Sequence, residues 1–428
     1  MGKIKIGVFG GARGFDLFWE MLYNPDAEVV AVCDKYGPVL DKCRKAAEDA
    51  GRKIALFTSF DEFIECDMDA VVLANYAHEH AIYAVRCLES GRHVLSEVLP
   101  GETPAQLVKL IETVKRTGLV YSYAENYCYR KSTFEMWKRY KKGDIGEVQY
   151  AEGEYIHDAS DIWPQITYGE RDHWRNRMSP TFYCTHSCGP IITITGMRAV
   201  RVVGFETNRN YEEKQMRIGN NQKAGIEMMT LENGAIVKSV HGGLKKDEPS
   251  VNYQVYGTKG MMQSGRYGPE EFNIYREGPK FCQGEWEHYD PVNEIGMGMA
   301  GNDSGHGGSD FYPSHIFIEK LLGRPDGEWS IDVYSACNMG MVGLLAYRSI
   351  LAGNIPMDIP DFRILAERDK YRYDNICTSP ELAGDKVQPY TSHGEVVFPD
   401  SVYEDLRKQW LGEKSGISDL YPEPGEDE

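Results

Sequence analysis

Long apolar runs, paired cysteines and an excess of basic residues are all absent from this chain of 428 residues. Without a run of about 18 uninterrupted apolar residues we expect no membrane-spanning helix, and the first residues do not resemble a signal peptide. A formal net charge of −18 argues against nucleic acid or an anionic membrane as a partner, because both require basic patches. The ten cysteines include no C-x-x-C pair, which is typical of free thiols in a reducing cytoplasm.

A glycine-rich turn follows the first predicted strand. Residues 3–9 are rich in β-branched side chains, Gly10, Gly11 and Gly14 come next, and apolar residues then recur at helical spacing. Glycines in such a turn let the backbone approach a pyrophosphate, and the free N–H groups of the helix start hold its charge. Because Ala12 stands where the second glycine of G-x-G-x-x-G belongs, the turn alone is also compatible with a strand–helix unit that binds nothing.

An acidic residue closes the second predicted strand. Residues 28–33 end in Asp34, about 20 positions after the glycines. A carboxylate at this place can accept both hydroxyls of an adenosine ribose, and it repels a 2′-phosphate. We therefore predict NAD as the cofactor in preference to NADP.

Strands alternate with helices through the first part of the chain. Helices are predicted over residues 38–50, 78–90 and 103–117, and residues 69–74 form the near-continuous apolar run expected of a central parallel strand. This order predicts an α/β fold: a dinucleotide-binding Rossmann domain, residues 1–125, with a doubly wound parallel sheet.

The pattern changes near residue 143. Residues 147–157 alternate with a period of two, and strands separated by turns follow from 195 to 265, before helices at 310–322 and 332–352. We predict a C-terminal α+β domain for substrate binding and oligomerisation, residues 126–365, with a large, open, mostly antiparallel sheet. Residues 366–428 form a polar, proline-rich extension with a short helix at 401–411 and an acidic tail.

Polar side chains follow three different predicted strands of the first domain. Asn75, Glu97 and Asn126 lie at the carboxyl ends of these strands, where ligands bind in open α/β sheets. His80 and Tyr129 lie within the same segments. Each residue also has a plain structural role available, since Asn75 can cap a helix, Glu97 can be a solvated acid and Tyr129 can pack in the core.

A second cluster combines aromatic, basic and titratable residues. Trp174 and Arg175 precede Tyr183 and His186, which would share one face of a helical turn. A phenol and an imidazole that relay protons to each other can move a proton to or from a sugar hydroxyl. The alternative is a helix start that buries a hydrogen-bonded histidine.

Two further segments invite a ligand. His306 is followed by two glycines that allow close approach, although Ser309 or Asp310 can instead cap a helix. Residues 184–188 contain two cysteines and a histidine, but the sequence offers no nearby partners for a four-ligand site. We expect no metal.

Residues 3–365 resemble the Gfo/Idh/MocA oxidoreductases, in which a dinucleotide domain precedes an open-faced sheet domain. The resemblance rests on Asp34, on Asp69 to Val72 with His80 further on, on Gly91 to Glu97, and on Asn354 to Pro360. In many members a Glu-Lys-Pro segment follows the His-Val-Leu strand, and its lysine takes part in hydride transfer at a sugar or inositol hydroxyl. Here Val98 replaces that lysine, and the usual Asp-x-x-x-His pair is absent, so that mechanism does not carry over directly.

These departures resemble the NAD-dependent glycosidases of the α-N-acetylgalactosaminidase type. The shared marks are Tyr-x-x-His before Gly-Pro at 183–190, a preceding Trp-Arg pair, Glu-Val at 97–98, and His-Gly-Gly-x-Asp at 306–310. The resemblance implies that Glu97, Tyr129, Arg175, Tyr183 and His186 face the sugar over the nicotinamide. In such enzymes the bound NAD takes a hydride from C3 of the sugar, and the ketone acidifies the proton on C2. Loss of that proton expels the aglycone, water adds, and the hydride returns.

We therefore expect a cytoplasmic NAD-dependent oxidoreductase that oxidises a ring hydroxyl, at C3, of a sugar or glycoside. The residues expected to bind the cofactor are Gly10, Ala12, Arg13, Gly14, Asp34, Asn75, His80, Glu97 and Asn126. The residues expected to act in catalysis are Tyr183 and His186 on the hydroxyl proton, Tyr129 in a second proton transfer, and Glu97. The residues expected to bind the substrate are Tyr129, Trp174, Arg175 and His306.

Two other functions remain open at this stage. A redox-neutral glycoside hydrolase or lyase would use the same first step, and a non-catalytic NAD-sensing regulator would keep only the nucleotide site. By the resemblance alone, the sheet of the second domain pairs with another subunit, so we expect a homo-oligomer, a dimer or a tetramer.

Overall fold

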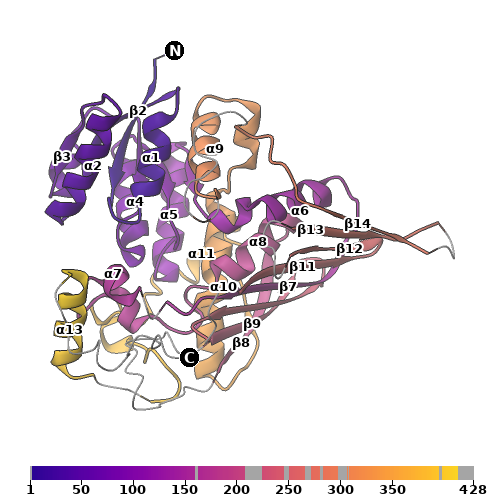
Figure 1. Ribbon diagram of the computed structural model, residues 1–428. Helices are drawn as coiled ribbons and strands as arrows, with labels where there is room; N and C mark the ends of the chain where they lie inside the picture. Colours follow the sequence, from indigo (N-terminus) through magenta and orange to yellow (C-terminus); the bar gives the residue numbers. More distant parts are fainter. Residues whose placement is uncertain are drawn as a thin grey trace, which may run out of the picture.

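The computed structural model describes residues 2–159, 162–207, 224–244, 250–265, 271–279, 283–296, 306, 308–394 and 398–412. Within these residues the chain forms two sheets, one parallel and one mostly antiparallel, with helices packed between and around them (Figure 1). Both sheet types agree with the sequence-based prediction. The acidic tail predicted at the C-terminus lies outside the described residues.

The N-terminal sheet has six strands in the order β3-β2-β1-β4-β5-β6, and every pair is parallel. Its strands are β1 (Ile4–Phe9), β2 (Ala27–Cys33), β3 (Ala55–Phe57), β4 (Ala70–Leu73), β5 (His93–Ser96) and β6 (Tyr121–Tyr123). Its helices are α1 (Phe15–Tyr23), α2 (Gly37–Asp49), α3 (Phe60–Phe63), α4 (His80–Glu89) and α5 (Pro104–Thr117), with a 3-10 turn η1 (Ala77–Glu79) before α4. Strands β2 and β3 are added on one side of β1, and β4 to β6 on the other. This reversal of strand order leaves a crevice at the carboxyl ends of β1 and β4.

Local sequence signals explain the helix boundaries in this domain. Thr103 accepts the backbone N–H of Gln106, whose side chain returns a bond to the backbone of Thr103, so a capping box starts α5. Gly118 ends α5 in the left-handed region with a φ of 70°. These signals fix where the strand after α5 begins, and hence where its polar carboxyl end lies.

The second sheet has nine strands among the described residues, in the order β14-β13-β12-β11-β7-β10-β9-β8-β15. They are β7 (Val148–Ile156), β8 (Ala199–Glu206), β9 (Ala224–Leu231), β10 (Ile236–Gly242), β11 (Ser250–Gly257), β12 (Gly260–Ser264), β13 (Phe272–Arg276), β14 (Glu285–Tyr289) and β15 (Met357–Asp358). The central pair β7 and β10 is parallel, and the other pairs are antiparallel.

Helices cover one face of this second sheet (Figure 1). They are α6 (Lys131–Lys141), α8 (Thr185–Thr195) and α10 (Val333–Leu351), while α9 (Phe311–Leu321) packs against α1 of the first domain. Every residue of α8 is buried, because the helix is enclosed by β7, β10, β11, α6 and α10. α8 therefore lies between the second sheet and the helices α6 and α10.

Close backbone contact sets the position of α8 on β7. A Cβ atom on Gly153 of β7 would lie 1.9 Å from the carbonyl oxygen of Ser187, so only glycine admits the helix at this distance. The next residue on the same face of β7 is Tyr155, which therefore lies beside the first turn of α8.

After the second sheet the chain forms the helices α11 (Leu365–Asp369), α12 (Pro380–Ala383) and α13 (Asp400–Trp410). A further short helix, α7 (Trp163–Thr167), lies between β7 and α8 in the chain. Figure 1 shows α13, in yellow, beside α7 and close to the edge of the first domain. Among the described residues, no helix combines the length and the hydropathy that crossing a membrane would need.

Candidate functional site

A pocket of about 440 Å³ opens at the carboxyl ends of β1, β2 and β4. The residues predicted to bind the nucleotide that line it are Gly10, Ala12, Arg13, Asp34 and Asn75. The other lining residues are Phe9, Lys35, Tyr36, Thr58, Phe60, Ala74, Tyr76, Glu79, Tyr83, Tyr168, Glu170, Arg407 and Trp410. The sheet topology thus brings together predicted residues from three separate sequence segments, those that follow β1, β2 and β4.

Gly10 and Gly14 let the turn after β1 pack against the end of β4 and against itself, because neither carries a side chain. Gly10 has a φ of 94°, and a Cβ atom on it would lie 2.4 Å from the carbonyl of Ala74. A Cβ atom on Gly14 would lie 2.1 Å from the carbonyl oxygen of Gly10. The turn therefore presents bare backbone at the start of α1, as a pyrophosphate requires.

Asp34 and Asn75 supply the polar groups of this pocket. The two carboxylate oxygens of Asp34 accept the backbone N–H groups of Gly11, at 2.8 Å, and Tyr36, at 2.9 Å. Burial raises the pKa of Asp34 while these N–H groups oppose the rise. The Oδ1 atom of Asn75 is buried and accepts no hydrogen bond from the residues that the structure describes. A bare turn, an oriented acid and an unsatisfied amide together fit a dinucleotide.

Arg13 joins the glycine turn to the second domain. Its Nη2 atom lies 2.6 Å from Oε1 of Glu97 and 2.9 Å from Oδ1 of Asp310. Asp310 also accepts Nδ2 of Asn126 at 2.8 Å and contacts Nδ1 of His306 at 2.7 Å. Burial alone would raise the pKa of Asp310, but the bond from His306 and the charge of Arg13 hold it below its usual range. Burial raises the pKa of Glu97 against the opposing charge of Arg13.

His186 has a buried carboxylate partner. Its Nδ1 atom lies 2.6 Å from Oε1 of Glu125, which has no solvent exposure. Because an ionised carboxylate only accepts hydrogen bonds, a neutral imidazole paired with it carries its proton on Nδ1, which leaves Nε2 as the acceptor nitrogen. Three tyrosine rings surround the imidazole, with centroids at 4.6 Å (Tyr127), 4.8 Å (Tyr155) and 5.0 Å (Tyr183).

Arg175 lies over the aromatic residues beside His186. Its guanidinium is 4.5 Å from the ring centre of Trp174 and 5.1 Å from that of Tyr183. Burial raises the pKa of Tyr183, and the charge of Arg175 opposes that rise. The phenol of Tyr183 therefore holds its proton at neutral pH and can donate it in a hydrogen bond.

A smaller cavity of about 70 Å³ borders this cluster on the side of the second sheet. Its titratable lining residues are Tyr155, His157, Arg175, Tyr183 and His241. Tyr155 and Nδ1 of His157 share a hydrogen bond of 2.9 Å. Burial lowers the pKa of His157, and His186 and His306 lower it further, so its ring is neutral at pH 7.

Behind the cavity lies a second carboxylate–histidine pair. Nε2 of His241 is 3.1 Å from Oε1 of Glu227, whose other oxygen accepts the hydroxyl of Ser239 at 2.6 Å. Glu227 and His241 are both buried, on the neighbouring strands β9 and β10. The floor of the cavity is therefore polar and held in one orientation.

Two predicted site residues lie elsewhere. The hydroxyl of Tyr129 donates to the carbonyl of Trp329 at 2.8 Å, and its ring packs against Phe134 and Trp137, so it belongs to the core and not to the crevice. The two ring nitrogens of His80 lie 3.0 and 3.1 Å from the carbonyl oxygens of Leu99 and Asn75.

His80 is fully enclosed and does not line the described pocket. Burial lowers its pKa to about 4. Its place between two carbonyl groups shows that it ties the segment after β4 to the segment after β5. The structure gives both residues structural contacts, and the predicted cofactor contact of His80 and proton transfer of Tyr129 find no support among the described contacts.

The predicted site residues did not include Glu125, Tyr127, Tyr155, His157, Glu227 and His241, which the structure adds to the cluster. Glu125 directly precedes Asn126 at a strand end, so its position carried a signal. Tyr155 and His157 lie in a stretch whose period of two predicted a strand but no chemistry. No sequence pattern pointed to His241.

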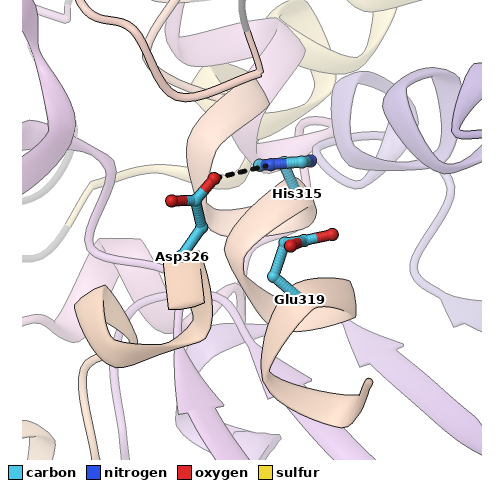
Figure 2. Close-up of side chains that lie close together, drawn as sticks. All are labelled: His315, Glu319 and Asp326. Atoms are coloured by element: carbon cyan, nitrogen blue, oxygen red, sulfur yellow. Dashed lines mark ion pairs between the residues drawn. The ribbon is translucent and has the colours of Figure 1, made fainter. Parts of the chain in front are cut away.

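One group of metal-ligating residue types occurs among the described residues, outside the crevice. His315 and Glu319 of α9 and Asp326 of the 3-10 turn η4 (Pro325–Trp329) place ligand atoms within 4.8 Å of one another (Figure 2). Nε2 of His315 lies 3.6 Å from Asp326, and Glu319 lies 2.9 Å from Nη1 of Arg324. Since Arg324 already supplies positive charge here, ion pairs account for the group, and the absence of a metal stays a prediction.

Comparisons with known proteins agree with this geometry. The family profile "Oxidoreductase family, NAD-binding Rossmann fold" matches residues 4–125, and "Glycosyl hydrolase 109, C-terminal domain" matches residues 129–366. A glycosyl hydrolase family 109 protein of Saccharopolyspora erythraea is 26% identical over 390 residues, covering 84% of this chain and 83% of that protein. One from Bacteroides thetaiotaomicron is 24% identical over 400 residues, with 84% of each covered.

Solved structures share the fold. A levoglucosan dehydrogenase in complex with NADH and L-sorbose has a TM-score of 0.66 at 15% identity, covering 84% of this chain and 100% of that one. The myo-inositol 2-dehydrogenase of Lactobacillus plantarum has a TM-score of 0.63 at 15% identity, covering 83% and 99%. The first domain is thus an NAD-binding Rossmann domain of the oxidoreductase type. Because the second profile spans more than half of the 428 residues, this NAD-binding chain belongs to glycosyl hydrolase family 109.

Proposed function

We propose that this protein cleaves a glycoside in a redox-neutral cycle that begins with oxidation of a ring hydroxyl, at C3, of the sugar. The observation that supports the proposal is two neighbouring proton-handling pairs, His186 with Glu125 and Tyr155 with His157. Tyr155 and His157 line the small cavity, and the ring of His186 contacts its lining residues Tyr155 and Tyr183. Net oxidation of a hydroxyl requires a single proton acceptor. Cleavage through a ketone also requires groups that remove the C2 proton and protonate the departing oxygen.

Bound NAD supplies the hydride acceptor in this cycle, and Gly10, Gly14, Asp34 and Asn75 would hold it. The carboxylate of Glu125 holds the proton of His186 on Nδ1. Nε2 then acts as the base that accepts the proton of the sugar hydroxyl. Tyr183, protonated because it is buried, donates a hydrogen bond to the same oxygen and holds it at the base.

Substrate orientation falls to the cationic and aromatic groups around the cavity. The guanidinium of Arg175 lies over the rings of Trp174 and Tyr183. Its N–H groups can donate hydrogen bonds to sugar hydroxyls. The Glu227–His241 pair offers a fixed polar floor on the opposite side. Sugar rings bind well to such mixtures of planar apolar faces and directed donors.

The test is product analysis in deuterated water with a panel of 4-nitrophenyl glycosides, beginning with the α-N-acetylgalactosaminide. We expect nitrophenolate to appear without a net increase in the absorbance of NADH, and the released sugar to carry deuterium at C2. Steady accumulation of NADH would instead indicate that the protein is a dehydrogenase that oxidises the sugar without cleaving it. Cleavage without deuterium at C2 would refute the ketone route.

A further inference from the structure

Helix α13 contributes to the nucleotide pocket although it lies beyond both family profiles, the second of which ends at residue 366. Arg407 and Trp410 of this helix line the pocket together with Tyr36 and Tyr168. Figure 1 shows α13 beside α7, at the edge of the first domain. The extension is therefore part of the NAD site and not a separate appendage.

The position of α13 is defined by specific packing. Val402 and Leu406 bury their side chains against Trp163 of α7. Nη1 of Arg407 donates to the carbonyl of Tyr168 at 3.2 Å. Gly169 has a φ of 64°, and a Cβ atom on it would lie 2.3 Å from the backbone nitrogen of Arg407.

A side chain at position 169 would therefore clash with the backbone of α13, so the glycine allows the helix to pack at this distance. An ion pair between Arg171 and Asp400 holds the first turn of α13 as well.

Trp410, at the end of α13, completes an aromatic group at one end of the pocket. Its ring centroid lies 4.4 Å from that of Tyr36 and 5.0 Å from that of Tyr168, and the guanidinium of Arg407 lies 4.9 Å from its ring. Tyr36 follows the ribose acid Asp34 by two residues and is bound to it through its backbone N–H. The aromatic group therefore stands next to the place where the adenosine ribose is recognised.

We propose that α13 is an adenosine clamp: Trp410 and Tyr36 stack against the adenine of NAD, and Arg407 covers the outer face of Trp410. The inference rests on the proposed redox-neutral cycle, in which NAD is restored in each turnover and gains nothing from leaving. A dehydrogenase must exchange NADH for NAD, so a cover over the adenosine half would slow it. Aromatic stacking of one base commonly changes affinity by about 10-fold to 100-fold.

The test compares Trp410→Ala and Trp410→Phe in the full chain with Trp286→Ala. Trp286 lies on β14, at the far edge of the second sheet, and is 52% exposed, so its loss serves as a matched control. Each protein is loaded with NADH, and the loss of NADH fluorescence is followed after addition of excess NAD. The dissociation constant of NAD is measured by titration calorimetry.

We expect release of NADH from Trp410→Ala to be about 10-fold to 100-fold faster than from the wild type. Trp410→Phe retains an aromatic face, so its rate of NADH release should be close to that of the wild type. Trp286→Ala should release NADH at the wild-type rate. Equal release rates in all four proteins would overturn the clamp and leave the proposed function in place. Failure of the wild type itself to bind NAD would overturn the proposed function, and the clamp with it.

Discussion

Replacing Glu125 by glutamine tests the assignment of His186 as the base. The substitution preserves size and burial, and it changes the group that faces Nδ1 of His186 from an acceptor to one that can donate. The contact is 2.6 Å long and buried on both sides, so the exchange acts on the ring directly. A donor at this place moves the ring proton to Nε2, where it blocks proton removal from the substrate.

The size of the effect follows from that loss. A positioned general base contributes about 10²-fold to 10⁴-fold to the rate, which is roughly 3–6 kcal/mol of the barrier. We expect kcat of Glu125→Gln to fall by that factor. Binding of NAD should stay unchanged, because Glu125 is not among the described residues that line the nucleotide pocket.

The assay is nitrophenolate release at saturating glycoside, with NAD affinity measured on the same samples by calorimetry. Glu135→Gln is the matched control, since Glu135 is also a buried acid but pairs with Lys138 and Arg139 on α6, outside the crevice. A kcat within about threefold of the wild type for Glu125→Gln, with NAD still bound, would refute the role of the Glu125–His186 pair.

Three further substitutions test other parts of the site. Gly10→Ala should weaken NAD binding at least about 10-fold, because its Cβ atom would lie 2.4 Å from the carbonyl of Ala74; unchanged affinity by calorimetry would contradict the bare-turn argument. Tyr183→Phe should lower kcat about 10²-fold in the nitrophenolate assay with little change in NAD affinity; wild-type turnover would remove Tyr183 from the mechanism. Burial lowers the pKa of His173 to about 2, and its Nδ1 accepts the backbone N–H of Arg175. The folded-state pKa lies below the unfolded value of about 6.5, so this contribution to stability is present above about pH 6.5 and is lost as the pH falls. Between about pH 7 and pH 5 the wild type should lose about 2 kcal/mol more than His173→Asn in urea unfolding, and parallel losses would show that His173 does not titrate.

The nucleotide half of the site was predictable because its signals are local. A glycine turn after a strand and an acid at the next strand end are short patterns, and a parallel sheet places all its carboxyl ends on one edge. Asp34 and Asn75 could therefore be placed without knowing a single tertiary contact. The same reasoning placed Asn126 at a strand end, and the structure joins it to Asp310, although it is not among the described residues that line the nucleotide pocket.

The proposed catalytic half of the site depends on packing that no short pattern encodes. Glu125 and His186 are 61 residues apart and meet because α8 is seated on β7 by Gly153. Tyr127 and Tyr129 show the limit most clearly, since both lie in the 3-10 turn η2 (Asn126–Tyr129). Successive residues of such a turn point in different directions, so Tyr127 meets His186 whereas Tyr129 enters the core.

The parallel pair at the centre of the second sheet has a consequence for the order of folding. On one side of β7, strands β8, β9 and β10 are consecutive antiparallel neighbours, and on the other side β11 to β14 form a second such series. Both series can assemble through contacts that are local in sequence, whereas β7 precedes them and pairs with one strand of each. Closing those two long connections is slow. The strand that carries Tyr155 is therefore expected to pair late, so the nascent chain acquires its catalytic cluster only after both halves of the sheet exist.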